Sequence, residues 1–285
     1  MKAKDNLFQV KTTLNISGNL VSLAIPKVMG ILNVTPDSFY SQSRVNAENE
    51  IILQAESMLE SGAFILDVGG YSTRPNATNI SVAEELKRVI PSIENIRKQF
   101  PETIISIDTF RAQVAKAAVD AGADMINDVS GGSLDDEMFS TVAMLGVPYL
   151  LMHMRGTPET MNGLVDYDHL INDILFELDE KCKRLSSMGV RDIIIDPGFG
   201  FAKTIDQNYE ILRNLGLFKA LKHPVLAGLS RKSMIYKKLG FSSEKALNGT
   251  TALNMAALMN GASILRVHDV KEAMETVSLY QAYRG

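Results

Sequence analysis

Residues 193–203 read IIIDPGFGFAK, and this stretch decides the fold. The three consecutive isoleucines are typical of a parallel strand covered on both faces, because β-branched side chains suit a pleated sheet and no polar position marks a wet side. Asp196 ends the run, and Pro197 cannot donate a hydrogen bond to a neighbouring strand. The glycines that follow allow a sharp turn or a close approach to a ligand. The stretch therefore predicts a carboxylate on a buried strand, at the rim of a glycine-rich loop.

A lone aspartate after a strand is also a common turn residue, because its carboxylate accepts a hydrogen bond from the backbone. Asp196 is not alone, since seven other stretches have the same form. They are residues 27–34, 63–70, 103–109, 124–130, 148–154, 224–230 and 263–269. At or just past their ends stand Asn33, Thr73 with Arg74, Asp108, Asn127, Met152, Lys232, and Arg266 with His268. Eight strands with such residues at their carboxyl ends predict an α/β fold of the (β/α)8 TIM-barrel type, whose sites lie on that rim.

The chain length fits one such barrel. It has 285 residues, of which 46% are hydrophobic, and one barrel takes about 250 residues. We therefore expect a single domain over residues 1–285. Residues 1–26 hold two short alternating pieces around Ser17-Gly18-Asn19, which is a turn signal. They predict an N-terminal hairpin that closes the bottom of the barrel.

The composition excludes several classes of function. The net charge of −4 and a pI near 5.7 leave no basic surface for nucleic acid. No apolar run is long enough for a signal peptide or a membrane span, so we expect no membrane partner. Cys182 is the only cysteine, which rules out an internal disulfide or a cysteine-based zinc site and favours a reducing cytoplasmic location. No HExxH pair or nucleophile elbow occurs, which argues against zinc and serine hydrolases.

Two groups of side chains are expected at the barrel mouth, because residues two apart along a strand share a face. The first group is cationic and consists of Arg74, Lys232, Arg266 and His268, with Asn33 nearby. Converging cations indicate an anion, and arginine forks match phosphate oxygens, so this group predicts a phosphate or diphosphate site. The open alternative is that each cation pairs with a nearby aspartate.

The second group consists of Asp108, Asn127 and Asp196 beside Met152. Carboxylates and an amide in an apolar cavity suit a ligand that presents several N–H donors in one plane, and each charge-assisted bond contributes roughly 1.5 to 3 kcal/mol. Met152 offers a polarisable surface for a flat ring. His153 then points away from the mouth, where we expect it to make a supporting hydrogen bond.

Eight segments carry a resemblance to a known family. They are MGILNVTPDSF (29–39), DVGGYSTRP (67–75), SIDT (106–109), INDVSGG (126–132), LMHMRGTPETM (151–161), DPGFGFAK (196–203), GLSRKSM (228–234) and ILRVHDVKE (264–272). Together they span nearly the whole barrel in order, and the chain closely resembles the dihydropteroate synthase family. The resemblance implies a transferase of folate biosynthesis that condenses 6-hydroxymethyl-7,8-dihydropterin diphosphate with 4-aminobenzoate. The products would be 7,8-dihydropteroate and pyrophosphate.

The resemblance also implies Mg²⁺ as cofactor, a homodimer, and a role for each matching residue. The pterin would be held by Asp108, Asn127, Val129, Met152, Asp196, Gly228 and Lys232. The diphosphate would be held by Asn33, Arg74, Arg266 and His268, with Asn33 beside the metal. The 4-aminobenzoate would meet Phe39, Thr73, Pro75, Phe201, Lys232 and Ser233. Catalysis would rest on Asn33, Arg74, Asp108, Lys232, Arg266 and His268.

The chain departs from the family pattern after Phe39, where Tyr40, Ser41, Gln42 and Ser43 replace a frequent Ser-Asp-Gly-Gly, and at two later positions. Ser41 stands where an acidic residue is frequent, which leaves open any metal contact from that loop. Asn76 and Ala202 replace frequent glycines and should stiffen their loops.

Two other functions remain as alternatives. A pterin-dependent methyltransferase module would resemble this barrel, but it would not need the cationic group. A non-catalytic pterin-binding protein could keep Asp196 and Asn127 without that group. Residues 249–262 predict a helix that is apolar nearly all round, so it either faces a partner subunit or lies in the core beneath the last helix.

Overall fold

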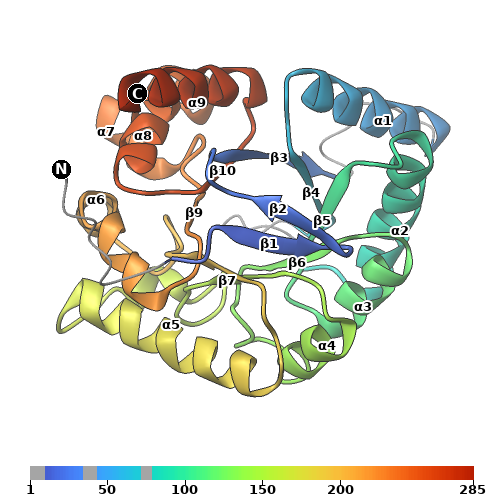
Figure 1. The fold of residues 1–285 in the computed structure, drawn as a ribbon, viewed down its shortest axis with the longest axis horizontal. Helices are drawn as coiled ribbons and strands as arrows, with labels where there is room; N and C mark the ends of the chain where they lie inside the picture. The colour runs from blue at the N-terminus through green and yellow to red at the C-terminus, as the bar shows by residue number, and fades with distance from the viewer. Residues whose placement is uncertain (1–9, 35–43, 72–78) are drawn as a thin grey trace.

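The structure is a computed structural model that describes residues 10–34, 44–71 and 79–285. At its centre, parallel strands form a barrel surrounded by helices (Figure 1). The strands are β3 (Lys27–Asn33), β4 (Ile65–Gly69), β5 (Ile104–Asp108), β6 (Met125–Asp128), β7 (Tyr149–Met152), β8 (Ile193–Asp196), β9 (Leu226–Ala227) and β10 (Ile264–Val267). Their order is β8-β7-β6-β5-β4-β3-β10-β9, and a parallel bridge from Ile195 to Val225 joins β8 to β9. The predicted barrel is confirmed.

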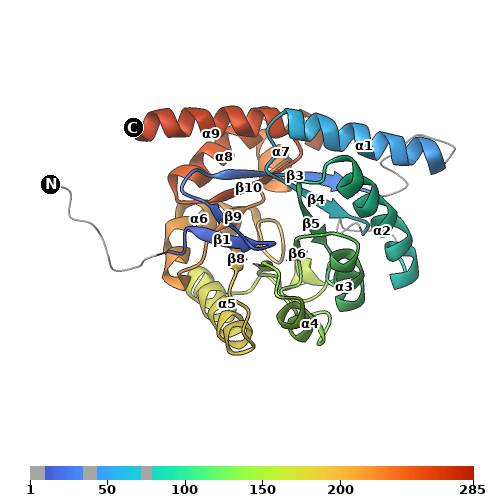
Figure 2. The ribbon, with the colours of Figure 1, turned by 45° about the vertical axis from the view of Figure 1, so that its right-hand side comes forward.

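Helices alternate with the strands and cover the outside of the barrel (Figure 2). They are α1 (Arg44–Glu60), α2 (Val82–Gln99), α3 (Ala112–Asp120), α4 (Met138–Leu145), α5 (Leu170–Ser187), α6 (Ile205–Arg213), α7 (Ser233–Leu239), α8 (Leu247–Met259) and α9 (Val270–Arg284). Short 3₁₀ turns occur at Met161–Gly163, Leu215–Leu221 and Ser243–Lys245. Helix α6 begins at a capping box, in which Thr204 and Gln207 satisfy each other's backbone N–H groups. In the part of the chain that the structure describes, no helix is long and apolar enough to cross a membrane.

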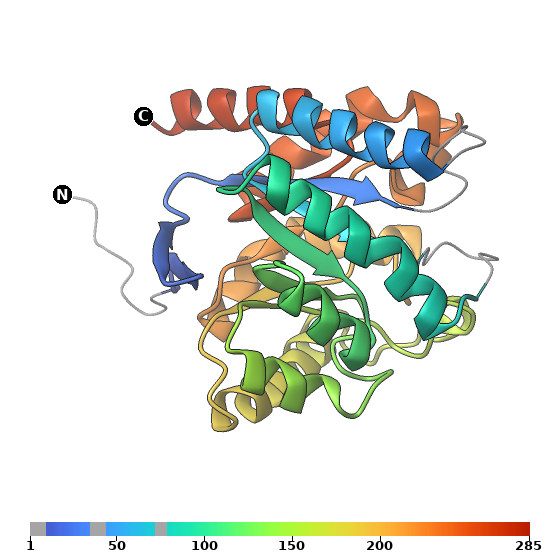
Figure 3. The same cartoon turned by 90° about the vertical axis from the view of Figure 1, so that its right-hand side faces the viewer.

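The predicted hairpin is present as β1 (Thr13–Ile16) and β2 (Asn19–Ser22). Ser17 and Gly18 adopt φ values of 51° and 84°, the positive pair that a tight two-residue hairpin turn requires. Leu14 and Ile16 are buried in a cluster with the side chains at the bottom of the barrel interior. Figure 3 shows the hairpin at the end of the molecule opposite the strand arrowheads. The hairpin therefore closes the bottom of the barrel, as expected.

The barrel interior changes from apolar at the bottom to polar near the mouth. The bottom layer, in contact with the hairpin, consists of Met29, Ile65, Met125, Leu150, Ile194, Leu226 and Ile264. Two residues further along their strands, the side chains are Ile31, Asp67, Asn127, Met152, Asp196, Gly228 and Arg266. The alternation of a strand gives both layers the same inward direction. Polar groups are thus held above an apolar floor.

Helix α8 packs against both α7 and α9. This is the packing expected of a core helix beside the last helix, one of the two interpretations that its apolar sequence allows. Met259 on α8 and Leu279 and Tyr283 on α9 nevertheless remain exposed. Helices α8 and α9 therefore carry large apolar side chains that the described residues 10–34, 44–71 and 79–285 leave exposed.

Candidate active site

The expected site residues divide into those that the structure describes and those that it does not. Outside the described residues lie Phe39, Ser41, Thr73, Arg74, Pro75 and Asn76. The remaining candidates stand at the carboxyl ends of the barrel strands or in the loops that follow them. The described candidates therefore come from β3, β5, β6, β7, β8, β9 and β10 and the loops after them.

Asp196 forms the turn that its sequence position allows and keeps one carboxylate oxygen outside that turn. Its Oδ1 accepts a hydrogen bond from the N–H of Gly198 at 2.7 Å, so the residue does form a turn. Its Oδ2 lies beside Gly228, where an added Cβ would stand 3.8 Å from Oδ2 and 3.9 Å from Nζ of Lys232. Burial raises the pKa of the Asp196 carboxyl, while Lys232 acts to lower it. One oxygen is structural, and the other faces a space that Gly228 keeps open.

Lys232 closes the same space from the loop after β9. Its ammonium donates to the carbonyl of Phe199 and lies 4.8 Å from the centre of the Phe201 ring. Burial lowers its pKa to about 8, and Asp196 opposes that shift. Ser233 follows directly as the first residue of α7. The predicted neighbours Phe201 and Lys232 are thus in contact.

Arg266 points into the barrel and is held by two carboxylates. Its Nε donates to Oδ2 of Asp67 at 2.6 Å, and its Nη2 donates to Oδ2 of Asp108. The open alternative, that a cation of the mouth pairs with aspartate, is therefore confirmed for Arg266. Burial raises the pKa of Asp108 to about 7 against the opposing effect of Arg266. Burial acts to lower the pKa of Arg266, but the carboxylates of Asp67 and Asp108 together have the larger effect and raise it. The guanidinium therefore stays charged.

Asp67 is a site residue that the sequence reasoning missed. Its Oδ2 also accepts from Nδ2 of Asn127 at 2.9 Å, so one carboxylate oxygen holds both the arginine and the amide. Its Oδ1 and the hydroxyl of Ser106, the residue opposite it in the β4–β5 register, are buried without a hydrogen-bond partner. The sequence did contain a signal for Asp67. This residue lies two positions after buried Ile65 on β4, so its side chain shares the inward face of the strand.

Asn33 and His268 stand at the ends of adjacent strands β3 and β10. Asn33 is half-buried at the last position of β3. Nδ1 of His268 lies 3.0 Å from the hydroxyl of Ser230, whose oxygen also accepts the backbone N–H of His268 at 3.2 Å. Asn33 and His268, two of the four residues expected at the diphosphate, therefore lie on the same side of the mouth.

An apolar cluster lines another part of the mouth. Met152 and Val129 pack with Met154, Met161 and Ala202. Phe201 is packed against this cluster while remaining half-buried. Met152 and Val129, expected at the pterin, are therefore contiguous with Phe201, expected at the 4-aminobenzoate.

The β8–α6 loop is fixed from outside the barrel by Lys203. Its ammonium donates to the carbonyls of Gly198 and Phe201, at 3.1 and 2.9 Å, and lies 3.0 Å from Nδ1 of His153. Nε2 of His153 lies 2.9 Å from Oε2 of Glu177 in α5. Because Nδ1 faces an ammonium, we assign the ring proton to Nε2. The expectation that His153 points away and makes a supporting hydrogen bond is confirmed.

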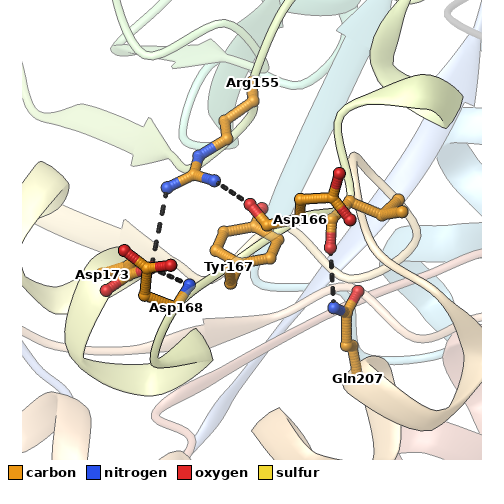
Figure 4. A pocket seen from close by; sticks show the side chains of 7 residues that line it. Arg155, Asp166, Tyr167, Asp168, Asp173 and Gln207 are labelled. Atoms are coloured by element: carbon orange, nitrogen blue, oxygen red, sulfur yellow. Dashed lines mark hydrogen bonds and ion pairs between the residues drawn. The ribbon is translucent and has the colours of Figure 1, made fainter.

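A polar cavity of about 320 Å³ lies next to this support (Figure 4). Arg155 donates to the carbonyl of Asp166 at 2.7 Å, and its guanidinium lies 4.0 Å from the centre of the Tyr167 ring. The hydroxyl of Tyr167 donates to the carbonyl of Ala202 at 2.9 Å. Ala202 has a φ of 49°, so this alanine holds a left-handed conformation that glycine would adopt at lower cost. The cavity wall therefore buttresses the loop that carries Phe201.

Comparisons with known proteins identify the family that this chain resembles in sequence and fold. The model of a family described as "Pterin binding enzyme" matches residues 29–268. A dihydropteroate synthase from Synechocystis sp. is 46% identical over 253 residues, which cover 88% of this chain and 87% of the relative. The structure of Xanthomonas albilineans dihydropteroate synthase with 4-aminobenzoic acid superposes with a TM-score of 0.89 at 39% identity, covering 96% and 98% of the two chains. A second structure of that enzyme, in complex with 7,8-dihydropteroate, gives a TM-score of 0.86 at 36% identity, covering 96% and 99%.

Proposed function

The chain belongs to the dihydropteroate synthase family of pterin-binding enzymes, and from that premise we propose that its barrel mouth carries out the family's reaction. The reaction joins 6-hydroxymethyl-7,8-dihydropterin diphosphate to 4-aminobenzoate and releases pyrophosphate. The observation that carries the proposal is the convergence of Asp196 Oδ2 and Lys232 Nζ on the space at Gly228, above an apolar floor. The relative and the structures reported above are dihydropteroate synthases matched over most of the chain, which favours this reaction over the methyltransferase alternative.

The pterin ring is assigned to the space between Asp196, Asn127 and Met152. A flat ring with several N–H groups offers donors to Oδ2 of Asp196, which the turn leaves available, and polarisable Met152 suits a ring face. Asn127 has its Nδ2 bound to Asp67, so its Oδ1 is left to accept from the ligand. Val129, Gly228 and Lys232 complete this pterin subsite.

The diphosphate is assigned to the side of the mouth that holds Asn33, Arg266 and His268, and Arg74 is proposed as a further ligand. When the bond from the pterin methylene to the diphosphate oxygen breaks, the electron pair stays on that oxygen. The lone pair of the aniline nitrogen then forms the new carbon–nitrogen bond, and that nitrogen loses a proton. Cationic side chains stabilise charge that develops on the leaving group, and no protein nucleophile is needed. Because Arg266 is already held by two carboxylates, its position is fixed before the substrate arrives.

The 4-aminobenzoate is assigned to the outer part of the mouth. Phe201, Lys232 and Ser233 lie there among the described residues, and Phe39, Thr73 and Pro75 are proposed to complete the subsite. The loop contacts of Lys203 hold the backbone of Phe201 in place. The aniline would thus approach the pterin methylene from the solvent side.

Magnesium fits this site as an ion shared with the substrate. Among the residues that the structure describes, no group of three or more His, Cys, Asp or Glu could hold a metal alone. Mg²⁺ typically keeps several waters and takes one or two protein oxygens together with substrate phosphates. The amide oxygen of Asn33 is such a ligand, at the end of β3. When bound, the ion would neutralise charge on the diphosphate.

The direct test incubates the purified chain with the dihydropterin diphosphate, 4-aminobenzoate and Mg²⁺ and measures dihydropteroate and pyrophosphate together. We expect both products in equal amounts and neither without magnesium. Pterin binding without either product would instead identify a non-catalytic pterin receptor.

The pterin assignment is tested by Asp196→Asn. Asparagine keeps the Oδ1 acceptor for Gly198 but replaces the oxygen at the ligand space with an amide N–H₂ group. We expect pterin affinity to fall roughly 100-fold, the equivalent of about 3 kcal/mol of charge-assisted hydrogen bonding, with little change in stability. Calorimetry with the hydroxymethyl pterin provides the measurement, and affinity within a few-fold of the native protein would refute the assignment.

The quaternary and cellular setting follows from the same premise. We propose a homodimer that buries exposed Met259, Leu279 and Tyr283 of α8 and α9, and light scattering after size exclusion gives its mass directly.

We further propose that residues 1–285 act as one domain, since Leu14 of the hairpin packs into the barrel interior. A cytoplasmic location is supported by the single buried thiol of Cys182.

A further inference from the structure

Arg231 occupies an unusual backbone position beside the site. It lies between Ser230 and Lys232 in the loop after β9 and has a φ of 56°. Non-glycine residues adopt this left-handed conformation only where their surroundings compensate for its cost. We therefore expect the side-chain and backbone contacts of Arg231 to stabilise this conformation.

The side chain of Arg231 forms a two-point ion pair with Asp269. Nε and Nη2 donate to Oδ2 and Oδ1 of Asp269 at 2.9 and 2.7 Å. The backbone N–H of Arg231 donates to the hydroxyl of Thr250 in α8 at 3.0 Å, and Nη1 donates to the carbonyl of Glu244 at 3.2 Å. Such a fork restrains direction as well as distance. Arg231 therefore holds the loop after β9 to the junction between β10 and α9.

A second tie runs alongside the first. The hydroxyl of Ser230 lies 3.0 Å from Nδ1 of His268 and accepts the backbone N–H of the same residue. Ser230 and His268 directly precede Arg231 and Asp269 in the chain. The two loops are thus joined at two successive positions, Ser230 with His268 and Arg231 with Asp269. Lys232 is the next residue of the first loop, and His268 itself takes part in one of the contacts.

We propose that Arg231 and Asp269 are a positioning pair that sets the separation between Lys232 and His268. The inference rests on the proposed function, in which these two residues hold the pterin end and the diphosphate end of one substrate. A substrate that spans both ends is bound well only when their separation is fixed in advance. A ligand that fills one end alone does not depend on that separation. The pair itself acts through its neighbours and not on the reacting atoms.

The test uses Arg231→Gln, Asp269→Asn and the double variant, with three calorimetric probes. The hydroxymethyl dihydropterin fills one end, pyrophosphate with Mg²⁺ fills the other, and the dihydropterin diphosphate without 4-aminobenzoate spans both. We expect each single variant to bind the spanning probe at least 10-fold more weakly and each short probe within about 3-fold of the native protein. The double variant should lose no more than the larger single loss, because the two residues act as a unit.

A matched control comes from the opposite end of the barrel. Arg97 forms an ion pair with Asp124 below β5 and β6, and the two side chains are 26% and 13% exposed, against 29% and 16% for Arg231 and Asp269. Arg97→Gln should lower stability without changing the affinity for any probe. Arg231→Lys, which keeps the charge but loses the fork, should recover part of the spanning affinity.

Three results would overturn the proposed pair: equal weakening of all three probes, unchanged binding of the spanning probe, or losses that add in the double variant. Failure of the proposed function itself would look different. The native protein would then bind the dihydropterin diphosphate no more tightly than the hydroxymethyl dihydropterin. In that case the diphosphate assignment would fail, and the positioning role of the pair would fail with it.

Discussion

Replacing Arg266 with methionine should destabilise the folded chain severely. The guanidinium is the cation shared by Asp67, which is 0% exposed, and Asp108, which is 16% exposed. Methionine fills similar volume but leaves two carboxylates near each other without that cation. Breaking a buried ion pair by removing one partner costs about 3 to 5 kcal/mol, since the remaining charge stays desolvated. The two lost charge-assisted hydrogen bonds, at roughly 1.5 to 3 kcal/mol each, lead to a similar figure.

The size of the thermal shift follows from the chain length. With 285 residues, the entropy of unfolding near the midpoint is about 0.6 kcal/mol/K, so a loss of about 4 kcal/mol lowers Tm by roughly 7 °C. Urea unfolding and calorimetry measure both quantities at pH 7.5. The double variant Asp67→Asn/Arg266→Met removes the most buried charge as well and should recover a substantial part of the loss. Arg213→Met, at an exposed position in α6, is the control and should change stability little.

The reasoning would be refuted by a loss below about 1 kcal/mol in Arg266→Met, which is the range of an exposed ion pair. It would also be refuted if Asp67→Asn in the Arg266→Met background lowered stability further. Either result would mean that the barrel interior supplies Asp67 and Asp108 with other compensation, such as water.

Three further predictions concern the support of the site and of the barrel. Burial lowers the pKa of His153 from 6.5 to about 4, so the folded chain binds fewer protons than the unfolded chain between these pH values. The free energy of unfolding should therefore fall by at most about 3 kcal/mol as pH drops from 6.5 to 4. His153→Gln should lack this pH-dependent loss when urea unfolding is compared across pH. Gly198→Ala should cost more than the roughly 1 to 2 kcal/mol of a left-handed alanine, because its Cβ would stand 2.0 Å from the carbonyl oxygen of His153; Gly189→Ala, with nothing within 4 Å, is the urea-unfolding control. Leu14→Ala should cost about 2 to 5 kcal/mol in urea unfolding by opening a cavity under the barrel, whereas Leu20→Ala, 78% exposed in the same hairpin, should cost little.

Each of these has a clear contrary result. A stability difference between the native chain and His153→Gln that stays constant from pH 7 to pH 4 would show that the imidazole is not buried as a neutral group. Equal costs for the alanines at 198 and 189 would deny the contact with the His153 carbonyl. A loss from Leu14→Ala as small as that from Leu20→Ala would mean that the hairpin does not close the barrel.

The fold and the inward residues could be predicted from the sequence because the signals are local. A strand alternates with period two whatever surrounds it, so the side chains of Asn127, Met152 and Asp196 could be assigned to one end of the barrel before their neighbours were known. The tight turn at Ser17-Gly18 was equally local. Strand ends were less accurate: β9 has only the two residues Leu226–Ala227, inside the predicted 224–230.

The partners of the site residues could not be predicted, because they depend on how strands far apart in sequence close into one barrel. Arg266 is 199 residues from Asp67 and 158 from Asp108, yet it binds both. The two-residue alternation of a strand placed the Arg266 side chain in the mouth, and its positive charge suggested an anion there. Only the closed barrel showed that two carboxylates already bind this arginine. Asp196 likewise allowed two local interpretations, and the structure shows that the turn uses only its Oδ1.

The sequence alone thus determined the barrel, its hairpin and the residue types at its mouth, since these follow from hydrophobic period, turn chemistry and strand ends. Only the tertiary structure decided which charges neutralise one another and which stay available to a ligand. Arg231 and Asp269 show the reason: they are 38 residues apart and on different loops, and their pairing exists only because β9 and β10 lie side by side. Charge compensation in a barrel is a property of spatial neighbours, which no local pattern records.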